Sequence, residues 1–289
     1  MKLNFLGTGA GEGYPGFWCR CPHCEYARSH GGRNVRGYSA AALDDTLLLD
    51  CGPTAFPTAG RLGLDLTQAK TLLITHPHED HVLPLQLMWR AANEQNCGLP
   101  FEEKTRHGGA RFTPIQPLTV YGNAFTEELL RGIWSPEIWE KNRMTFVRVK
   151  EGEAFEADGY RITPVRGNHS KPGFAHSYII EKGGRVLLYA LDSGGFDADQ
   201  QELLRQHVYN AVVMEGTYGL NSAGDGHHMS LQKNVEWLRF FRENGCCAKD
   251  FRFYLTHMSP HWCPPHDQYV EIAARHGLEV AYDGLEIEV

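Results

Sequence analysis

The chain has 289 residues, of which 42% are hydrophobic and 22% charged, and its formal net charge is −7. This length suits one large core or two modest ones, and the negative charge excludes an overall field that would attract nucleic acid or an anionic membrane. No apolar run approaches the length that spans a bilayer, and no signal-peptide pattern stands at the N-terminus, so we expect a cytoplasmic protein.

The first predicted strand covers residues 2–8, where apolar and polar side chains alternate. Gly7-Thr8-Gly9-Ala10-Gly11 ends it. Glycines after a strand could cradle a phosphate, but no Lys-Ser/Thr pair follows them, which favours a tight turn.

A cysteine cluster follows in a loop at about residues 17–26. Cys19, Cys21 and Cys24 place three thiol groups within six residues, which is three quarters of a tetrahedral zinc site. A redox pair is the alternative, but clustered cysteines in a chain of this length favour a metal. We therefore predict one structural Zn²⁺. The candidates for its fourth ligand are His261, Cys263 and, less well placed, His23. The other cysteines are predicted to be ordinary thiols: Cys51, Cys97, Cys246 and Cys247.

Two apolar runs, residues 46–52 and 71–75, predict buried strands. Asp50 lies at the end of the first run. An Asp at that position is either a turn residue or a group that orients a metal ligand through a hydrogen bond.

The run His76-Pro77-His78-Glu79-Asp80-His81 directly follows the second of these strands. We expect it on the loop that leaves the strand and on the first turn of a helix. His76 and His78 share a face of an extended segment and could hold one ion, while the turn directs Asp80 and His81 toward a second. Imidazole and carboxylate ligands suit zinc, manganese or iron. A polar loop with chance histidines is the alternative, but four ligand-type residues in six favour a two-metal site, which typically activates water and clamps a phosphoryl or acyl group.

Residues 93–116 break the regular pattern, because this segment is rich in glycine, proline and charge. A long irregular segment in a compact domain is usually a functional lid or a disordered loop. We expect an insertion that acts as a lid or a dimer contact.

Regular elements resume after this insertion. Helical spacing returns at residues 127–139. Further strands are predicted at residues 144–149, 160–165, 177–181, 185–191, 211–214 and 251–256. The turn Lys182-Gly183-Gly184 predicts a hairpin between two of them.

Several of these strands end in a ligand-type residue. His169 follows residues 160–165, Asp192 follows residues 185–191, and His257 follows residues 251–256. A charged Asp at the end of so apolar a strand would be costly to bury unpaired, and a metal relieves that cost. Because sites in layered α/β proteins sit on loops at one edge of the sheets, we expect these residues to meet the His76–His81 run.

The last third of the chain contains a predicted helix at residues 230–244. Its apolar stripe consists of Leu231, Val235, Leu238 and Phe241, and His227 and His228 lie just before it. At the C-terminus, residues 278–282 and 285–289 flank an Asp283-Gly284 turn and predict a hairpin.

This set of histidines and aspartates resembles the ligand set of the metallo-β-lactamase superfamily across nearly the whole chain. The resemblance implies an α/β (α+β) fold, a four-layer αββα sandwich that forms a single domain over residues 1–289. It also implies two divalent metals, Mn²⁺ or Zn²⁺, in the active site. The implied ligands are His76, His78 and His169 for the first metal, Asp80, His81 and His257 for the second, and Asp192 as the bridge. A histidine at position 78 is similar to the hydrolase branch, because the flavo-diiron oxidoreductase branch has an acidic residue there.

A narrower similarity is to the phosphoribosyl 1,2-cyclic phosphate phosphodiesterase family of the carbon–phosphorus lyase pathway. The segments that carry it are Gly7-Thr8-Gly9, Trp18-Cys19-x-Cys21-x-x-Cys24, Asn168-His169-Ser170, Leu255-Thr256-His257 and residues 279–287. The resemblance implies a structural zinc on the three cysteines and His261, and catalytic roles for His228 and Asp80. Pro260 lengthens the family's spacing before His261 by one residue, so Cys263 stays a candidate. Quinone-cofactor biosynthesis relatives share the cysteine cluster but depart at the active-site motif.

The expected function is that of a metal-dependent hydrolase. We expect a phosphodiesterase that cleaves a small, cyclic phosphodiester, such as phosphoribosyl 1,2-cyclic phosphate or a cyclic nucleotide, through a hydroxide that bridges the two metals. His228 would donate a proton to the departing oxygen; the alternative is a plain loop histidine.

Two other functions are considered. One is a hydrolase of the same fold that acts on a thioester, a lactone or an RNA 3′ end, although RNA binding needs clustered cations that the sequence does not display. The other is a non-catalytic, metal-stabilised binding protein. The expected partner is a small phosphorylated substrate rather than a membrane or nucleic acid, and a homodimer is an open option.

Overall fold

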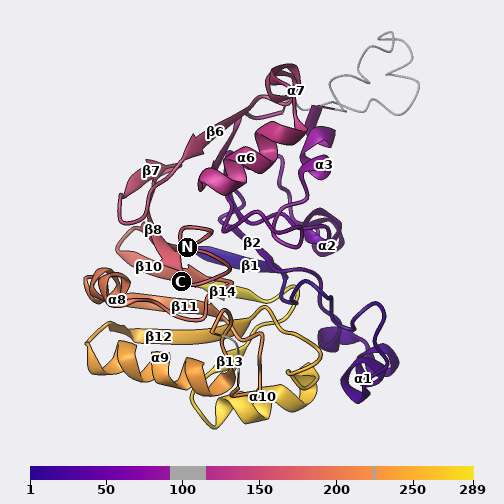
Figure 1. Cartoon of the computed structure of the whole chain (residues 1–289), viewed down its shortest axis with the longest axis vertical. Coiled ribbons are helices and arrows are strands. Elements are labelled where there is room, and N and C mark those ends of the chain that lie inside the picture. The colour runs from indigo at the N-terminus through magenta and orange to yellow at the C-terminus, as the bar shows by residue number, and fades with distance from the viewer. Residues whose placement is uncertain (92–114, 224–225) are drawn as a thin grey trace.

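The computed structural model of the chain describes residues 1–91, 115–223 and 226–289 (Figure 1). Two seven-stranded mixed sheets pack face to face, and helices cover their outer faces. The first sheet, in spatial order, consists of β14 (Glu286–Glu288), β1 (Lys2–Gly7), β2 (Ala40–Leu43), β3 (Leu47–Leu49), β4 (Thr71–Leu73), β5 (Leu118–Gly122) and β6 (Met144–Arg148). The second consists of β13 (Glu279–Val280), β12 (Cys247–Thr256), β11 (Tyr209–Glu215), β10 (Arg185–Ala190), β9 (Ala175–Lys182), β8 (Tyr160–Gly167) and β7 (Phe155–Ala157).

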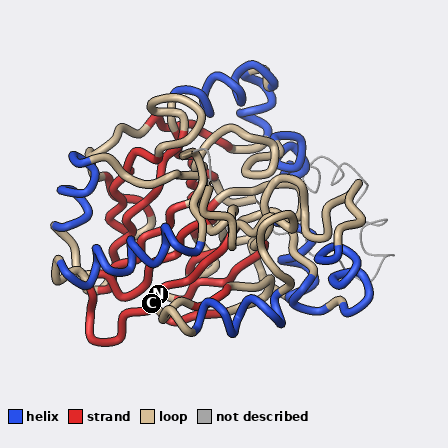
Figure 2. The backbone as a smooth tube through the Cα atoms, turned by 60° about the horizontal axis from the view of Figure 1, so that its bottom comes forward, coloured by secondary structure: helices blue, strands red, loops and turns tan. Residues whose placement is uncertain are grey.

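The helices lie outside this pair of sheets, as Figure 2 shows in blue around the red strands. They are α1 (Pro22–His30), α2 (Ala55–Leu62), α3 (Pro84–Leu87), α6 (Ala124–Ile133), α7 (Pro136–Lys141), α8 (Ala198–Arg205), α9 (Leu231–Glu243) and α10 (His266–Ala274), with 3-10 turns at Gly32–Asn34 and Met88–Ala91. Side-chain caps fix two of the starts, since Ser230 accepts from the Lys233 amide and Asn123 from the Thr126 amide.

The four layers follow from the two-residue period of the strands. In β2, Ala41 and Leu43 face the core between the sheets, while Ala40 and Ala42 face the helices of the first sheet. In β10 of the second sheet, Leu187 and Tyr189 face the other sheet, while Leu188 and Ala190 face the helices below it. Both faces of each sheet are therefore buried, which explains why these strands read as continuous apolar runs.

The directions of the strands place the carboxyl ends of several strands at the same edge of each sheet. Strands β3 to β6 run parallel, and so do β10 to β13. Strand β8 runs in the same direction as β10, because both are antiparallel to β9. The loops that follow β4, β8, β10 and β12 consequently leave their sheets at carboxyl ends, which is where sites in α/β proteins usually form.

The predicted C-terminal hairpin is wrong. Strand β13 pairs with β12 of the second sheet, whereas β14 pairs with β1 of the first. The Asp283-Gly284 turn carries the chain from one sheet to the other: the Asp283 carboxylate accepts hydrogen bonds from the Thr8 hydroxyl and the Gly37 amide, and the Gly284 amide donates to the Phe5 carbonyl. Tertiary hydrogen bonds thus override a local hairpin signal.

Two helix predictions need correction. Residues 127–139 do not form one helix, because Trp134 ends α6 and Pro136 begins α7 as a first-turn proline. The His76–His81 run does not enter a helix either, since α3 begins only at Pro84 and the ligands lie wholly on the loop before it. The hairpin between β9 and β10 is confirmed, with Lys182 opposite Arg185. The predicted insertion at 93–116 lies almost entirely outside the described residues.

Within the described part of the chain, no helix combines the length and apolar character that crossing a membrane would require.

Candidate metal centre

The loop after β4 brings four ligand-type side chains to the gap between the sheet edges. The His81 and Val82 amides both donate to the His78 carbonyl, which folds the loop into a tight turn. A Cβ atom on Gly52 would lie 1.8 Å from the Asp80 carbonyl oxygen, so this loop packs directly on the backbone that follows β3. That close approach fixes the position of Asp80.

One cluster consists of three ring nitrogens. His76 Nε2 lies 2.9 Å from His78 Nδ1, and His169 Nε2 lies 3.4 Å from the same atom. His76 and His78 come from the first sheet, and His169 from the loop after β8 in the second. Three imidazole nitrogens this close together form a donor set that a divalent metal ion would fill.

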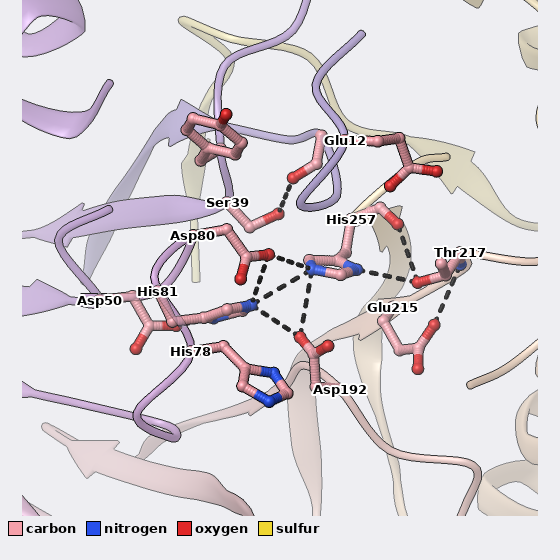
Figure 3. A network of polar contacts seen from close by, with 12 residues as sticks. Glu12, Ser39, Asp50, His78, Asp80, His81, Asp192, Glu215, Thr217 and His257 are labelled. Atoms are coloured by element: carbon pink, nitrogen blue, oxygen red, sulfur yellow. Dashed lines mark hydrogen bonds and ion pairs between the residues drawn. The ribbon is translucent and has the colours of Figure 1, made fainter. Parts of the chain in front are cut away.

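A second cluster lies beside the first (Figure 3). His81 Nε2 and His257 Nε2 are 3.2 Å apart, and Asp80 Oδ2 lies 3.3 Å and 3.4 Å from them, respectively. Asp192 lies between the two clusters. Its Oδ2 is 2.8 Å from His81 Nε2 and 3.2 Å from His257 Nε2, while its Oδ1 is 3.9 Å from His169 Nε2. One carboxylate therefore faces both clusters.

The outer nitrogens of the histidines are held by neighbouring oxygens. Asp50 Oδ2 lies 2.8 Å from His81 Nδ1, and the Thr217 hydroxyl lies 2.8 Å from His257 Nδ1. The Thr75 hydroxyl donates to Asp50 and lies 3.1 Å from the Nδ1 of His76. Contacts of this kind fix the ring orientation and the tautomer that leaves Nε2 free for a metal.

The protonation states of the described side chains suit metal binding. Burial lowers the pKa of His76 far below its usual value, so its ring is neutral. Burial would raise the pKa of Asp192, but His257, His81 and His76 outweigh it and hold the pKa well below the usual range. Burial opposes a proton on His81, yet Asp192, Asp80 and Asp50 raise its pKa well above normal. The carboxylates around His81 therefore favour a positive charge at this position, and a bound cation could supply that charge in place of the proton on His81.

The backbone is strained where these side chains leave the strands. Asp50, Asp192 and His257 all have left-handed backbone conformations, with φ of 59°, 46° and 57°. Such values are uncommon outside glycine and cluster at functional sites. Each bends the chain sharply after its strand and turns the side chain into the gap between the sheets.

His228 lies at the edge of the centre, and a buried carboxylate holds it. Its Nδ1 lies 2.9 Å from Glu215 Oε1 and 3.8 Å from Asp192 Oδ1, and its ring centroid is 4.9 Å from that of His169. Glu215, at the end of β11, is completely buried and also accepts from the Ser193 and Thr217 amides. The Nδ1 side of the ring is thus turned toward Glu215 and the opposite side away from it.

The cysteine cluster forms a separate group of donors. The sulfur atoms of Cys19, Cys21 and Cys24 lie within 4.8 Å of one another. A hydrogen bond from the Cys21 amide lowers the pKa of Cys19 to about 7, which favours the thiolate that binds metal. A hydrogen bond with His261 makes the smallest contribution to the lowered pKa of Cys19, and His261 Nδ1 also lies 3.4 Å from Glu12 Oε1. The Cys263 thiol donates to the Gly216 carbonyl at 3.2 Å.

His23, the third candidate for the fourth ligand of the cysteine cluster, contacts a backbone carbonyl group instead. His23 Nδ1 lies 2.9 Å from the Pro260 carbonyl.

The sequence matches a known protein family. Residues 45–258 match the model of the beta-lactamase superfamily domain. The chain belongs to the beta-lactamase superfamily. It is accordingly a metallo-β-lactamase-fold hydrolase, and the family uses divalent metals.

Curated relatives are distant. The chain is 22% identical to coenzyme PQQ synthesis protein B of Cupriavidus necator over 99% of both proteins. It is 26% identical to ribonuclease Z of Metallosphaera sedula over 74% of this chain and 56% of the relative. The chain thus spans little more than half of that ribonuclease.

Solved structures share the fold over the whole length. A diphosphatase of the PhnP family superposes with a TM-score of 0.72 at 23% identity and covers 100% of this chain and 96% of its own. Zn²⁺-bound PqqB from Methylobacterium extorquens has a TM-score of 0.72 at 18% identity and covers 100% of both chains. Because these identities are below 25%, the two similarities establish the fold of this chain but not its substrate.

Sequence reasoning gave no role to three residues of the site. Glu215 was visible only as the end of a strand, Thr217 as part of a loop, and Phe174 as one of many aromatic residues. Phe174 packs its ring 5.0 Å from His78 and 5.8 Å from His76 and so walls one side of the three-nitrogen cluster. A carboxylate directly after an apolar strand, the signal that identified Asp192, would also have identified Glu215.

Proposed function

We propose that the protein hydrolyses a small phosphodiester, such as phosphoribosyl 1,2-cyclic phosphate or a cyclic nucleotide, at a centre of two divalent metal ions. The observation that carries the proposal is Asp192, whose two carboxylate oxygens face two adjacent donor clusters. Two cations held a few ångströms apart favour displacement at phosphorus, because both the attacking and the leaving oxygen need stabilisation.

In this proposal each of the two clusters binds one metal ion. His76, His78 and His169 would hold the first metal, Asp80, His81 and His257 would hold the second, and Asp192 lies between the two donor sets. Mn²⁺ and Zn²⁺ both fit a donor set of imidazole and carboxylate. When bound, such ions lower the pKa of water and polarise phosphate oxygens.

The side chains supply the remaining steps. Asp80, a member of the second cluster, orients the attacking water by accepting a hydrogen bond. His228, held through Nδ1 by Glu215, presents Nε2 to the phosphate and donates a proton to the departing oxygen. Phe174 shields the three-nitrogen cluster from solvent on one side.

The cysteine cluster is proposed to hold a structural zinc ion with His261 as its fourth ligand. The contact between His261 and Cys19 favours this choice, and the bond from the Cys263 thiol to the Gly216 carbonyl argues against Cys263. A closed set of four protein ligands is typical of structural zinc.

A hydrolase that acts on a thioester, a lactone or an RNA 3′ end is the second candidate. Its support is the ribonuclease Z relatives and the breadth of this fold. The phosphodiesterase is preferred because a buried carboxylate–histidine pair beside two cation sites suits protonation of a phosphate ester's leaving oxygen.

A substrate panel tests the proposal. Protein saturated with Mn²⁺ or Zn²⁺ is assayed with bis(p-nitrophenyl) phosphate, cyclic nucleotides, thioesters and lactones. We expect turnover of phosphodiesters, and a decrease in kcat of about 10²–10⁴-fold for His228→Ala at unchanged metal content. Turnover of thioesters or lactones without phosphodiesters would overturn the reaction class, and full activity of His228→Ala would remove this residue from the mechanism.

A further inference from the structure

An apolar cavity of about 310 Å³ lies beside the metal centre and is not explained by phosphodiester cleavage alone. Its walls include Phe17, Arg28, Val35, Tyr38 and Thr54. The volume is at the lower end of the range of small-molecule sites, which is roughly 300–1,000 Å³.

Two segments that line the cavity pack against Asp80 of the metal centre. A Cβ atom on Gly52 would lie 1.8 Å from the Asp80 carbonyl and 3.3 Å from the Tyr38 Cβ, so Tyr38 stands against the Asp80 backbone. A Cβ on Gly11 would lie 3.2 Å from Asp80 Oδ2, and two residues later the same loop reaches the cavity wall at Gly13. Burial, and after it the charges of Asp80 and Glu79, raise the pKa of Tyr38, which agrees with its place between the cavity and the centre.

The walls suit a flat aromatic ring. Phe17 and Tyr38 form two adjoining walls, with ring centroids 6.3 Å apart and planes at 60°. Phe17 is 66% exposed although it is a large apolar side chain, so its face is open to a ligand. Arg28 is fixed by hydrogen bonds to Glu25 and to the Gly16 carbonyl, both at 2.8 Å. Such bonds lie in the guanidinium plane and leave its faces open to stacking.

The loop geometry maintains these walls. Gly13 has a φ of +75°, and its Cβ position lies 3.5 Å from the Phe17 ring. The Gly16 amide contacts the Cys24 sulfur at 3.3 Å. The cavity is therefore built on the same short segment as the cysteine cluster, rather than on a free surface loop.

We infer that this cavity binds the nucleobase of a nucleoside phosphodiester whose phosphate lies at the metal centre. The inference rests on the proposed function and narrows it, because phosphoribosyl 1,2-cyclic phosphate has no aromatic group and a nucleotide has one. In a nucleotide a pentose separates the base from the phosphate, and in the protein Tyr38 lies between the cavity and the Asp80 backbone. Stacking of a base on aromatic side chains contributes roughly 1–3 kcal/mol, or about 5- to 150-fold in affinity.

The kinetic test compares two esters that release the same p-nitrophenolate: thymidine 5′-(p-nitrophenyl) phosphate and ethyl p-nitrophenyl phosphate. With the metal-loaded protein we expect KM to be at least about 10-fold lower for the thymidine ester. Phe17→Ala should remove most of that preference by raising KM for the thymidine ester. Trp18→Ala is the matched control, because Trp18 is the fully exposed neighbour of Phe17 and does not line this cavity. Val35→Ser changes a second residue of the cavity wall and should also raise KM for the thymidine ester.

A binding measurement complements the kinetics. Calorimetric titrations with adenosine 5′-monophosphate and ribose 5-phosphate should differ by about 10-fold in Kd for the unaltered chain and for Trp18→Ala, and should become equal for Phe17→Ala. Equal binding of the two ligands, or equal KM for the two esters, would overturn the inference while leaving the phosphodiesterase intact. Hydrolysis of neither ester would instead count against the proposed function itself.

Discussion

Glu215 illustrates how a single residue places a proposed proton donor. It is completely buried, and its two oxygens accept from the Ser193 and Thr217 amides and face His228 Nδ1. The residue thus acts through His228 as a positioning residue.

Glu215→Gln should lower kcat by about 10- to 100-fold with a smaller change in KM, because the amide group of glutamine would meet a donor at one of these positions. The decisive comparison is the double variant with His228→Ala. If Glu215 works through His228, the double variant should be no slower than His228→Ala alone. Multiplying losses in the double variant, at equal metal content, would contradict the coupling.

His176 makes the stability of the fold depend on pH. The side chain is buried, its Nδ1 has no hydrogen-bond partner among the described residues, and burial lowers its pKa to about 4. The unfolded chain, with a pKa near 6.5, binds the proton more readily. Stability is therefore complete above pH 6.5 and falls by about 3 kcal/mol between pH 6.5 and pH 4.

His176→Met should flatten this part of the pH profile. Urea unfolding of both proteins at pH 7 and pH 4.5, with the same excess of metal, measures the difference. Parallel loss of stability in the two proteins would show that other groups account for the acid sensitivity.

At the scale of elements, the close packing of the loop after β3 on the loop after β4 positions Asp80. Gly52→Ala should displace the Asp80 carbonyl, because the added Cβ would lie 1.8 Å from it. We expect a loss of roughly 1–3 kcal/mol in stability together with weaker metal binding. Gly60→Ala in α2 is the control, since its Cβ would meet no atom within 4 Å and should stabilise the helix by roughly 0.5–1 kcal/mol. Metal content and urea midpoints check both variants; a Gly52→Ala protein with normal values would contradict the packing argument.

The strands with long apolar runs, and the ligand-type residues after them, could be predicted from the sequence. Buried strands such as β10 carry a strong local signal, and a charged residue directly after such a run indicates that its charge is matched elsewhere. The final segment could not be predicted, because the Asp283-Gly284 turn looks the same locally whether it closes a hairpin or joins two sheets. Only the tertiary bonds from Thr8 and Gly37 decide it.

Other features of the site depended on long-range contacts as well. The role of Asp50 stayed open in the sequence, because its contact with His81 joins two different strand ends. The cavity at Phe17 and Tyr38 was not foreseen, since its walls are separated in the chain and no periodic pattern marks them. The sequence thus shows locally which residues can act as metal ligands, whereas the side chains that they contact depend on the topology of the fold.

For the whole molecule, the centre joins the two sheets. His76, His78, Asp80 and His81 extend from the first sheet, whereas His169, Asp192 and His257 extend from the second. Without a cation, the facing nitrogens and carboxylates depend on shared protons. A metal that binds both sides only in the folded state should stabilise the entire fold.

Removal of metal by a chelator should therefore lower the melting temperature by roughly 5–10 °C, since a ligand at 100 times its Kd contributes about 2.7 kcal/mol. A smaller shift is expected for Asp192→Asn, which keeps the left-handed backbone accessible and removes the charge that faces both clusters. Asp158→Asn, at an exposed left-handed position, should behave like the unaltered chain. Equal shifts in all three proteins would assign the stabilisation to the cysteine-bound ion alone.

The most direct measurement is anomalous diffraction from crystals of the metal-loaded protein, collected on both sides of the zinc and manganese absorption edges. Two peaks flanking the Asp192 carboxylate, about 3.5–4 Å apart, are predicted, together with a third beside Cys19, Cys21 and Cys24. Density at the cysteines alone, with none between the two sheets, would contradict the account.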